Sequence, residues 1–144
     1  KFYEEKFLPC SICCLYATSP LRSAKDIIET VALVTEGQHE KAYAVTSFDL
    51  PVHQAVRIED NSGSVIPVFP NLINKRSEDV ASFWVDNGST YVAQTLQFLQ
   101  NPNFLDGNVG LYKMPKVRSV DIDTEYDFKQ ALYFAQNLKE RVDK

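Results

Sequence analysis

The sequence has few of the features that mark membrane-spanning, exported or nucleic-acid-binding proteins. No apolar run approaches the roughly 20 residues that cross a bilayer, and the charged start, KFYEEK, is not followed by the apolar region of a signal peptide. Only 15 of the 144 residues are Lys or Arg, against 19 Asp or Glu, and the formal charge is −4. Duplex nucleic acid is therefore a poor candidate partner, and we expect a soluble protein with no membrane contact.

Glycine, histidine and cysteine are also scarce, which argues against several kinds of site. The five glycines form neither G-x-x-x-x-G-K nor G-x-G-x-x-G, and G-x-S-x-G is missing. Cys10, Cys13 and Cys14 have no second cysteine pair to complete a zinc site, and their odd number gives no disulfide framework. We expect them to be small buried apolar residues in a reducing compartment such as the cytoplasm. His39 and His53 are expected on the surface or in loops rather than as catalytic bases.

What is present describes one globular α/β domain. The chain is long enough to bury a core, with 44% apolar and 24% charged residues. Residues 11–17 (SICCLYA) and 42–48 (AYAVTSF) are typical of buried strands, and a helix lies between them. Ser23 and Asp26 predict a capping box at its start, and Gly37 predicts its end. Its expected apolar stripe contains Ile27, Ile28, Val31, Ala32 and Val34. This order predicts a βαβ unit of a parallel sheet.

Turn and capping residues in the rest of the sequence predict a hairpin and a C-terminal helix. Residues 55–58 and 65–69 flank DNSG at 60–63, which favours a β-hairpin that projects from the main sheet as an inserted element. Further predictions are a polar loop at 74–79, strands at 88–93, 109–114 and 118–122, and a short helix at 94–100. Thr124 and Asp127 predict the start of the last helix. Apolar residues follow at helical spacing: Phe128, Ala131, Leu132, Ala135, Leu138 and Val142.

The triplet Asp121-Ile122-Asp123 is the strongest candidate for chemistry. Residues two apart in a strand point to the same side, so both carboxylates of a strand ending here would face one place beside a helix N-terminus. Magnesium takes one or two carboxylates with water and substrate phosphate, and the helix N-terminus favours the phosphate charge. The alternative is that Asp123 only caps the helix, but Thr124 and Asp127 already account for the cap.

Four of the five arginines divide into two groups. Arg22 follows Ser-Pro-Leu in a turn, and Arg76 lies in the polar loop, so these two are expected to bind an anionic ligand. Arg57 and Arg118 are expected to be solvated surface charges.

Four segments in order resemble a family of cytidylyltransferases that activate nine-carbon acidic sugars, the CMP-sialic acid and CMP-pseudaminic acid synthetases. They are LYATSPLR at 15–22, AVTS at 44–47, NKRSED at 74–79 and VDIDTEYD at 120–127. The run CLYAT at 14–18 is more similar to the pseudaminic branch, because Tyr16 departs from the glutamine of the sialic branch.

The resemblance implies a Rossmann-like nucleotidyltransferase sheet, with an insertion at about 52–80 whose hairpin forms a homodimer or larger homo-oligomer. It implies that the sugar hydroxyl attacks the α-phosphate of CTP, giving a CMP-sugar and pyrophosphate, with Mg²⁺ neutralising phosphate charge. Asp121 and Asp123 match the family's metal-binding pair. Thr18 and Ser19 match the turn lining the substrate cleft, and Arg76 lies in a motif near the sugar acid.

The main departure from the family is the lack of its N-terminal loop of the form ARGGSK, which holds the CTP phosphates. Residues 1–8 look like the tail of a helix that would follow that loop. We therefore expect residues 1–144 to be a single partial domain with one bare strand edge, inactive unless another chain supplies the missing half. Two alternatives are a non-catalytic interaction module that keeps the dimerising insertion, and a glycosyltransferase using the D-x-D pair with manganese.

Overall fold

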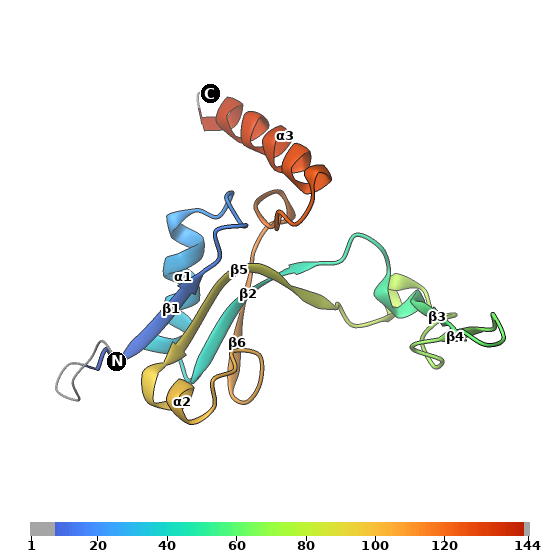
Figure 1. Cartoon of the computed structure of the whole chain (residues 1–144), viewed down its shortest axis with the longest axis horizontal. Coiled ribbons are helices and arrows are strands. Elements are labelled where there is room, and N and C mark those ends of the chain that lie inside the picture. The colour runs from blue at the N-terminus through green and yellow to red at the C-terminus, as the bar shows by residue number, and fades with distance from the viewer. Residues whose placement is uncertain (1–7, 143–144) are drawn as a thin grey trace. The chain divides into compact units, whose positions relative to one another are not determined.

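The computed structural model describes residues 8–142, with the side chains of residues 8–137 (Figure 1). The helix expected over residues 1–8 thus lies, except for Leu8, outside the described residues. The chain forms two compact units, which we describe separately. The sheet unit comprises the residues up to Thr46 and those from Asp86 onward, and the hairpin unit comprises Ser47–Val85.

The sheet unit is built on a mixed four-stranded sheet. The strands are β1 (Ser11–Leu15), β5 (Trp84–Gln94), β2 (Lys41–Ser47) and β6 (Val109–Lys113), side by side in that order. β1 pairs antiparallel with β5, and β2 pairs parallel with β6. The Gln94 N–H donates to the carbonyl of Glu40, just before β2, so β5 also runs opposite to β2. β1, α1 and β2 follow one another as predicted and the two strands run the same way, but the sheet is mixed rather than parallel, because the antiparallel strand β5 lies between β1 and β2.

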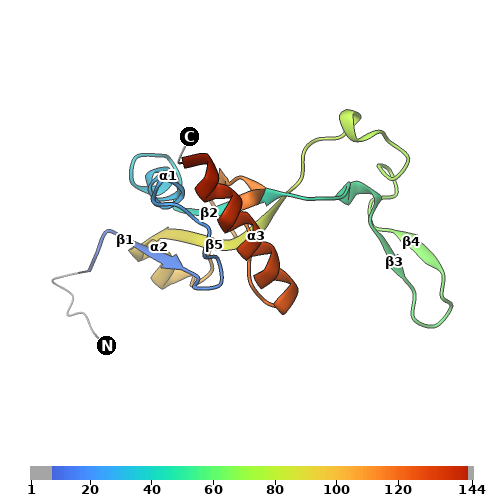
Figure 2. The same ribbon diagram turned by 90° about the horizontal axis from the view of Figure 1, so that it is seen from above.

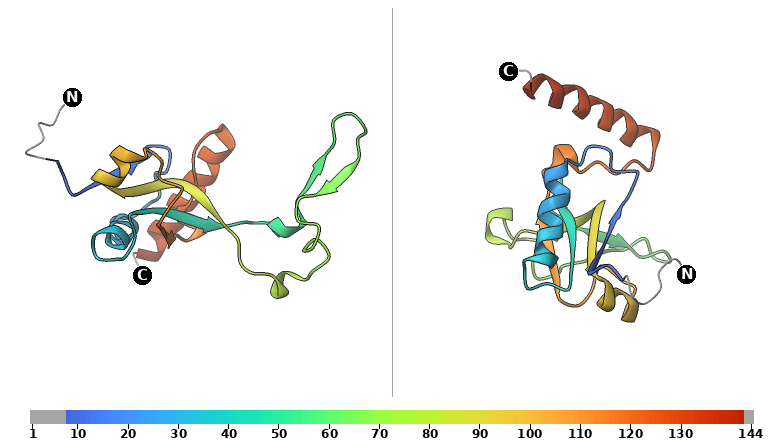
Figure 3. Two further views of the ribbon diagram at one scale, coloured as in Figure 1. Left: turned by 90° about the horizontal axis from the view of Figure 1, so that it is seen from below. Right: turned by 90° about the vertical axis from the view of Figure 1, so that its left-hand side faces the viewer.

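Helix α1 (Ala24–Thr35) packs on one face of this sheet, against β6 and β1 (Figure 3). The predicted capping box is confirmed, since the Ser23 hydroxyl accepts from the Asp26 N–H and the Asp26 carboxylate accepts from the Ser23 N–H. The predicted apolar stripe is only partly buried. Val34 packs in the core with Ala42 and Val92, but Ile28 is 65% exposed. The fully buried positions of the helix include Asp26 and Thr30, for reasons given below.

Strand β1 is shorter and more exposed than its sequence predicts. It ends at Leu15, and its residues alternate between half-buried and exposed. Cys10 and Cys13 are exposed and Cys14 is half-buried, so the prediction that the cysteines are buried is wrong. Within residues 8–142 only β5 pairs with β1, which makes β1 an edge strand of the described sheet.

The elements after β5 include one correction. Helix α2 (Thr95–Gln100) and strand β6 confirm their predictions, but residues 118–122 form no strand. The chain instead makes a 3₁₀ turn at Lys116–Arg118 after Pro115. Its backbone donors are used locally, because the Arg118 N–H donates to Pro115 and the Ser119 N–H donates to Lys116. A proline followed by such a turn leaves no row of donors for a neighbouring strand.

Helix α3 (Glu125–Val142) begins at the predicted cap. The Thr124 hydroxyl accepts from the Asp127 N–H, and the Asp127 carboxylate accepts from the Thr124 N–H at 2.8 Å. Ala131 is buried, whereas Phe128 is 55% and Leu132 is 49% exposed. The expected contacts of Leu138 and Val142 lie outside the described side chains. None of the helices that the structure describes is long and apolar enough to cross a bilayer.

The hairpin unit contains β3 (Val56–Ile58) and β4 (Val65–Pro67), paired antiparallel as the sequence predicts (Figure 2). Gly63 has φ +67° beside the turn, a conformation that glycine adopts without strain. Two 3₁₀ turns, Val52–Gln54 and Ser77–Asp79, flank the hairpin in sequence. Ile58 and Val65 lie opposite each other and are 68% and 63% exposed, so the hairpin carries apolar side chains in solvent.

Candidate functional site

The candidate site lies at the end of the sheet where β1 and β6 finish. Residues 16–22 follow β1, residues 114–124 follow β6, and β5 begins beside them because it runs in the opposite direction. Ligands of open α/β sheets bind outside the carboxyl ends of the parallel strands. The site is therefore at the position where the topology favours ligand binding.

Backbone hydrogen bonds join these three segments. The carbonyl of Ser89 in β5 accepts from the Tyr16 N–H at 3.2 Å and from Nη1 of Arg22 at 2.8 Å. The Ile122 N–H donates to the carbonyl of Thr18 at 2.9 Å. The structure thus joins two segments that carry predicted site residues, one with Thr18 and Arg22 and the other with Asp121. Arg22, predicted to bind an anion, uses part of its guanidinium to fasten the turn to β5.

Asp121 lies against the backbone of Gly88. A Cβ added to Gly88 would lie 2.6 Å from Cγ of Asp121 and closer still to its Oδ2, so the carboxylate occupies the space of a side chain. Its other oxygen, Oδ1, is buried and has no hydrogen-bond partner among the described residues. A buried carboxylate oxygen without a donor is costly, and a bound cation is one way of satisfying it.

Asp123 is placed differently from Asp121. It is exposed, and its backbone N–H donates to Oδ2 of Asp127 at 3.3 Å, in the first turn of α3. Because residues 118–122 form no strand, the expectation that strand alternation directs both carboxylates to one side is wrong. Among the side chains that the structure describes, no three of the His, Cys, Asp or Glu type gather as a metal site. Any cation here would have at most two protein carboxylates, a number that magnesium accepts.

Ser19 has a second buried polar atom at this end of the sheet without a hydrogen-bond partner among the described residues. Its side chain has no solvent exposure, and its Oγ has no partner within the described part of the chain. Ser19 follows Thr18, whose carbonyl is tied to the segment that carries Asp121. Buried hydroxyls normally have a partner. This serine, predicted to line the substrate cleft, therefore has unused hydrogen-bonding capacity.

The sequence gives no sign of the ion pair that supports the Asp121 segment. Arg118, predicted to be a surface residue, donates from Nη2 and Nε to the two oxygens of Asp26, at 2.6 and 2.9 Å. Tyr112 and Ser23 also donate to this carboxylate. Burial alone would raise the pKa of Asp26, but the hydrogen bonds from Arg118, Ser23 and Tyr112 lower it to about 2. The prediction for Arg118 is wrong because its partner is 92 residues away in sequence.

A second polar pair supports the start of β5. The Tyr91 hydroxyl donates to both oxygens of Asp86, each at 2.9 Å, and the Gly88 N–H donates to Oδ1 of Asp86 at 3.1 Å. Burial raises the pKa of Tyr91 well above its usual value, and the hydrogen bond to Asp86 raises it further. In the sequence this arrangement is visible only as the spacing D-x-G-x-x-Y at 86–91. That spacing alone does not predict the hydrogen bonds, because it does not show that Gly88 has a positive φ.

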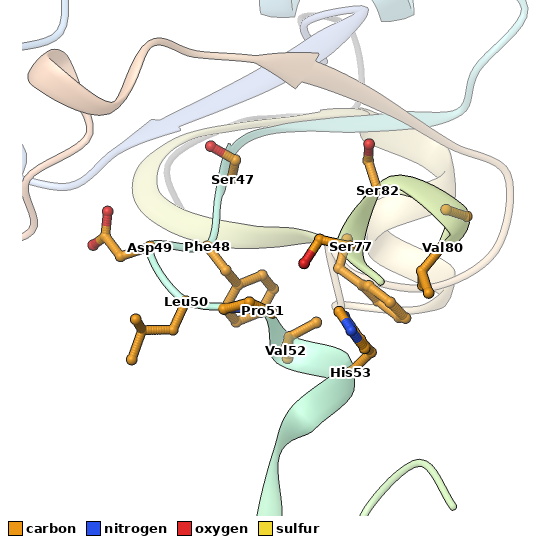
Figure 4. Close-up of a pocket in the computed structure, with 12 residues that line it drawn as sticks. Ser47, Phe48, Asp49, Leu50, Pro51, Val52, His53, Ser77, Val80 and Ser82 are labelled. Carbon is orange, nitrogen blue, oxygen red and sulfur yellow. The ribbon is translucent and has the colours of Figure 1, made fainter. Parts of the chain in front are cut away.

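The hairpin unit contains a pocket of its own (Figure 4). Its volume is about 290 Å³, and residues 47–53, Ser77 and residues 80–83 line it. His53, predicted to be a surface or loop residue, is only 3% exposed, and its Nε2 lies 3.1 Å from the carbonyl of Lys75. Arg76 precedes Ser77 of the pocket lining and forms an exposed ion pair with Glu78, with its Nε 3.0 Å from the carboxylate.

Comparison with known proteins identifies relatives that include two kinds of cytidylyltransferase. The chain is 26% identical over 124 residues to a pseudaminic acid cytidylyltransferase of Campylobacter jejuni subsp. jejuni serotype O:23/36, covering 85% of this chain and 53% of that protein. It is 28% identical over 135 residues to an N-acylneuraminate cytidylyltransferase of Escherichia coli O18:K1:H7, covering 92% of this chain and 32% of that protein.

A third relative is post-translational flagellin modification protein B of Campylobacter coli, 29% identical over 116 residues, or 80% of this chain and 48% of that protein. No family model matches the chain. The chain spans about half the length of the first relatives or less, and it resembles a partial member of the pseudaminic and N-acylneuraminate cytidylyltransferases. Its mixed α/β sheet is consistent with a nucleotidyltransferase-like fold.

Proposed function

We propose that this chain is the cation- and sugar-binding part of a cytidylyltransferase that activates a nine-carbon acidic sugar with CTP. In the proposed reaction a hydroxyl oxygen of the sugar bonds to the α-phosphorus of CTP. The bond from that phosphorus to the bridging oxygen breaks, pyrophosphate leaves, and the hydroxyl proton passes to solvent. The observation that carries this proposal is the Asp121 carboxylate, held against Gly88 with one buried oxygen unpaired, in a chain similar to such enzymes over 85% of its length.

Magnesium fits the residues at this end of the sheet. Asp121 has an orphaned buried oxygen, and Asp123 is exposed two residues further on, before helix α3. Oxygen ligands and one or two carboxylates are what magnesium requires. When bound, it would neutralise charge on the phosphates of CTP. Asp121 and Asp123 would hold it, and the N-terminus of α3 would add a favourable dipole for the phosphate.

Each unit by itself carries candidate residues for binding an acidic sugar. Arg76 has a guanidinium that is 80% exposed, and its pair with Glu78 is a surface ion pair of small energy, so a carboxylate ligand can compete for it. Thr18 and Ser19 would line the cleft, with the buried Ser19 hydroxyl as one hydrogen-bonding group. Arg22 would contribute positive charge from the same turn. A pseudaminic or a sialic acid type of sugar satisfies this chemistry.

We also propose that the chain works as a homodimer. An isolated two-stranded hairpin is marginally stable in water, and this one exposes Ile58 and Val65. Burying these side chains against a second copy would supply the missing stabilisation. The 144 residues contain no glycine-rich phosphate loop, so the triphosphate would need a loop from outside these residues.

A pyrophosphate-release assay tests the proposal. The chain would be incubated with CTP, Mg²⁺ and either pseudaminic acid or N-acetylneuraminic acid, alone and with the segment of the Campylobacter jejuni relative that it does not match. We expect no release from the chain alone and release from the mixture. Asp121→Asn should abolish that release, whereas Asp60→Asn in the hairpin turn should not.

A non-catalytic dimerising module is the second candidate, and the exposed apolar hairpin favours it. It predicts a stable oligomer whose melting temperature does not respond to CTP or to the sugar acids. A mixture of two folded, associated segments that releases no pyrophosphate would favour this candidate over the enzyme.

A further inference from the structure

Gly88 has a backbone conformation that few other residues tolerate. Its φ is +62°, in the left-handed region, within strand β5. Two other described glycines, Gly63 with φ +67° and Gly107 with φ +89°, share this feature. They differ from Gly88 in one respect, because a Cβ added to either would meet nothing within 4 Å.

At Gly88 the space of a side chain is occupied by the carboxylate of Asp121. The added Cβ would lie 2.6 Å from Cγ and 3.2 Å from Oδ1 of Asp121. The carboxylate and a side chain at position 88 therefore cannot occupy this space together. The absence of a side chain at Gly88 is therefore what allows Asp121 to lie in this position, with Oδ1 buried and unpaired.

The conformation of Gly88 is itself held by Asp86 and Tyr91. The Gly88 N–H donates to Asp86, and both oxygens of Asp86 accept from the Tyr91 hydroxyl. The Tyr91 ring is 6% exposed and packs against Tyr16, with ring centroids 5.0 Å apart. A buried, packed tyrosine is a rigid support for this hydrogen bond.

We infer that Gly88 is a positioning residue for Asp121, shaped by the Asp86–Tyr91 pair so that the Asp121 carboxylate is directed at a divalent cation. The inference rests on the proposed function, because it assumes the cation site. Gly88 acts through Asp121 and binds no ligand itself. Groups that orient a metal ligand typically change metal affinity by about tenfold to a hundredfold when they are removed.

The test measures Mn²⁺ binding to the full chain by electron paramagnetic resonance of the free ion. We expect Gly88→Ala to weaken Mn²⁺ binding by about tenfold or more, as expected for loss of a ligand-orienting group. Gly63→Ala is the matched control, because it imposes the same backbone strain without displacing a carboxylate. Circular dichroism and thermal melts of both variants would show that each chain remains folded.

A second variant and a mutant cycle separate positioning from simple destabilisation. Tyr91→Phe keeps the ring and removes the donor to Asp86, and we expect weaker Mn²⁺ binding in a folded chain. In an Asp121→Ala background, Gly88→Ala should no longer affect Mn²⁺ binding, and its effect on the melting temperature should fall to that of Gly63→Ala.

The outcomes distinguish this inference from the proposed function. If the unchanged chain binds Mn²⁺ and Gly88→Ala binds it equally well, the inference is overturned and the cation site stands. If the unchanged chain binds no Mn²⁺ at millimolar concentration, the cation site is overturned and the inference with it. The inference would also be overturned if Gly88→Ala had the same effects on Mn²⁺ binding and on the melting temperature with and without the Asp121 side chain.

Discussion

At the scale of single residues, Asp26 is a fully buried carboxylate whose partner Arg118 is 25% exposed. Removing one member of a buried ion pair leaves the other charge uncompensated. We expect Asp26→Asn to lower the free energy of unfolding by about 3 kcal/mol, the range found for such pairs. Urea denaturation followed by circular dichroism measures it.

The exposed pair of Arg76 and Glu78 provides the matched control for Asp26→Asn. Both side chains are largely in solvent, at 80% and 65% exposure. Glu78→Gln should therefore change stability by less than about 1 kcal/mol. Equal effects of the two substitutions would contradict the view that burial makes the Asp26 pair important.

The lowered pKa of Asp26 predicts that the free energy of unfolding depends on pH. The pKa of Asp26 is about 2 in the folded chain and 3.8 in the unfolded reference. The unfolded state therefore binds the proton more tightly, so this contribution to stability is present above pH 4 and is lost as the pH falls toward 2. We expect the stability difference between the unchanged chain and Asp26→Asn to shrink over that interval. Urea titrations at a series of pH values measure it, and a constant difference would contradict the assignment.

At the scale of elements, the sequence predicts well wherever local chemistry decides. The capping boxes of Ser23 and Thr124 mark the starts of α1 and α3 because side chain and backbone of neighbouring residues satisfy each other. The hairpin around Gly63 follows from turn residues between two apolar runs. These features need no information from distant parts of the chain.

Several failures of prediction involve partners that are distant in sequence. The apolar pattern of α1 could not show that Asp26 is buried, because Arg118 satisfies it from beyond β6. The run 118–122 has strand-like composition, but Pro115 and the bond from Ile122 to Thr18 divert it. The candidate site was predicted from Asp121, but not from Gly88 and Tyr91, whose roles depend on the positive φ of Gly88, which spacing does not reveal.

The hairpin unit gives a prediction at the same scale. Ile58 is 68% exposed on β3, opposite Val65 on β4, and a charged residue there would oppose burial against a second copy. We expect Ile58→Lys to convert a dimer into a monomer in analytical ultracentrifugation without lowering the melting temperature of the monomer. Leu99→Lys is the control, because Leu99 is 66% exposed on α2, outside the hairpin unit. An unchanged dimer in Ile58→Lys would place the interface elsewhere.

At the scale of the whole molecule, β1 is the element on which assembly with a further segment would depend. Among the strands of residues 8–142, only β5 pairs with it, and Leu15 is 43% exposed. A groove of about 530 Å³ lies at the start of this strand, lined by residues 8–11, 34–35 and 94–96. An edge strand with unpaired amides beside an apolar groove is a template for another strand.

Hydrogen exchange of β1 tests that expectation. In the chain alone, the amides of β1 that point away from β5 should exchange rapidly, because no strand in the described residues protects them. Adding the segment of the Campylobacter jejuni relative that this chain does not match should slow those amides, while the amides of β2, already paired with β5 and β6, should change little. Slow exchange throughout β1 in the chain alone would mean that its outer edge is already covered. Because the proposed enzyme needs a phosphate-binding loop from that added segment, protection of β1 should appear together with pyrophosphate release.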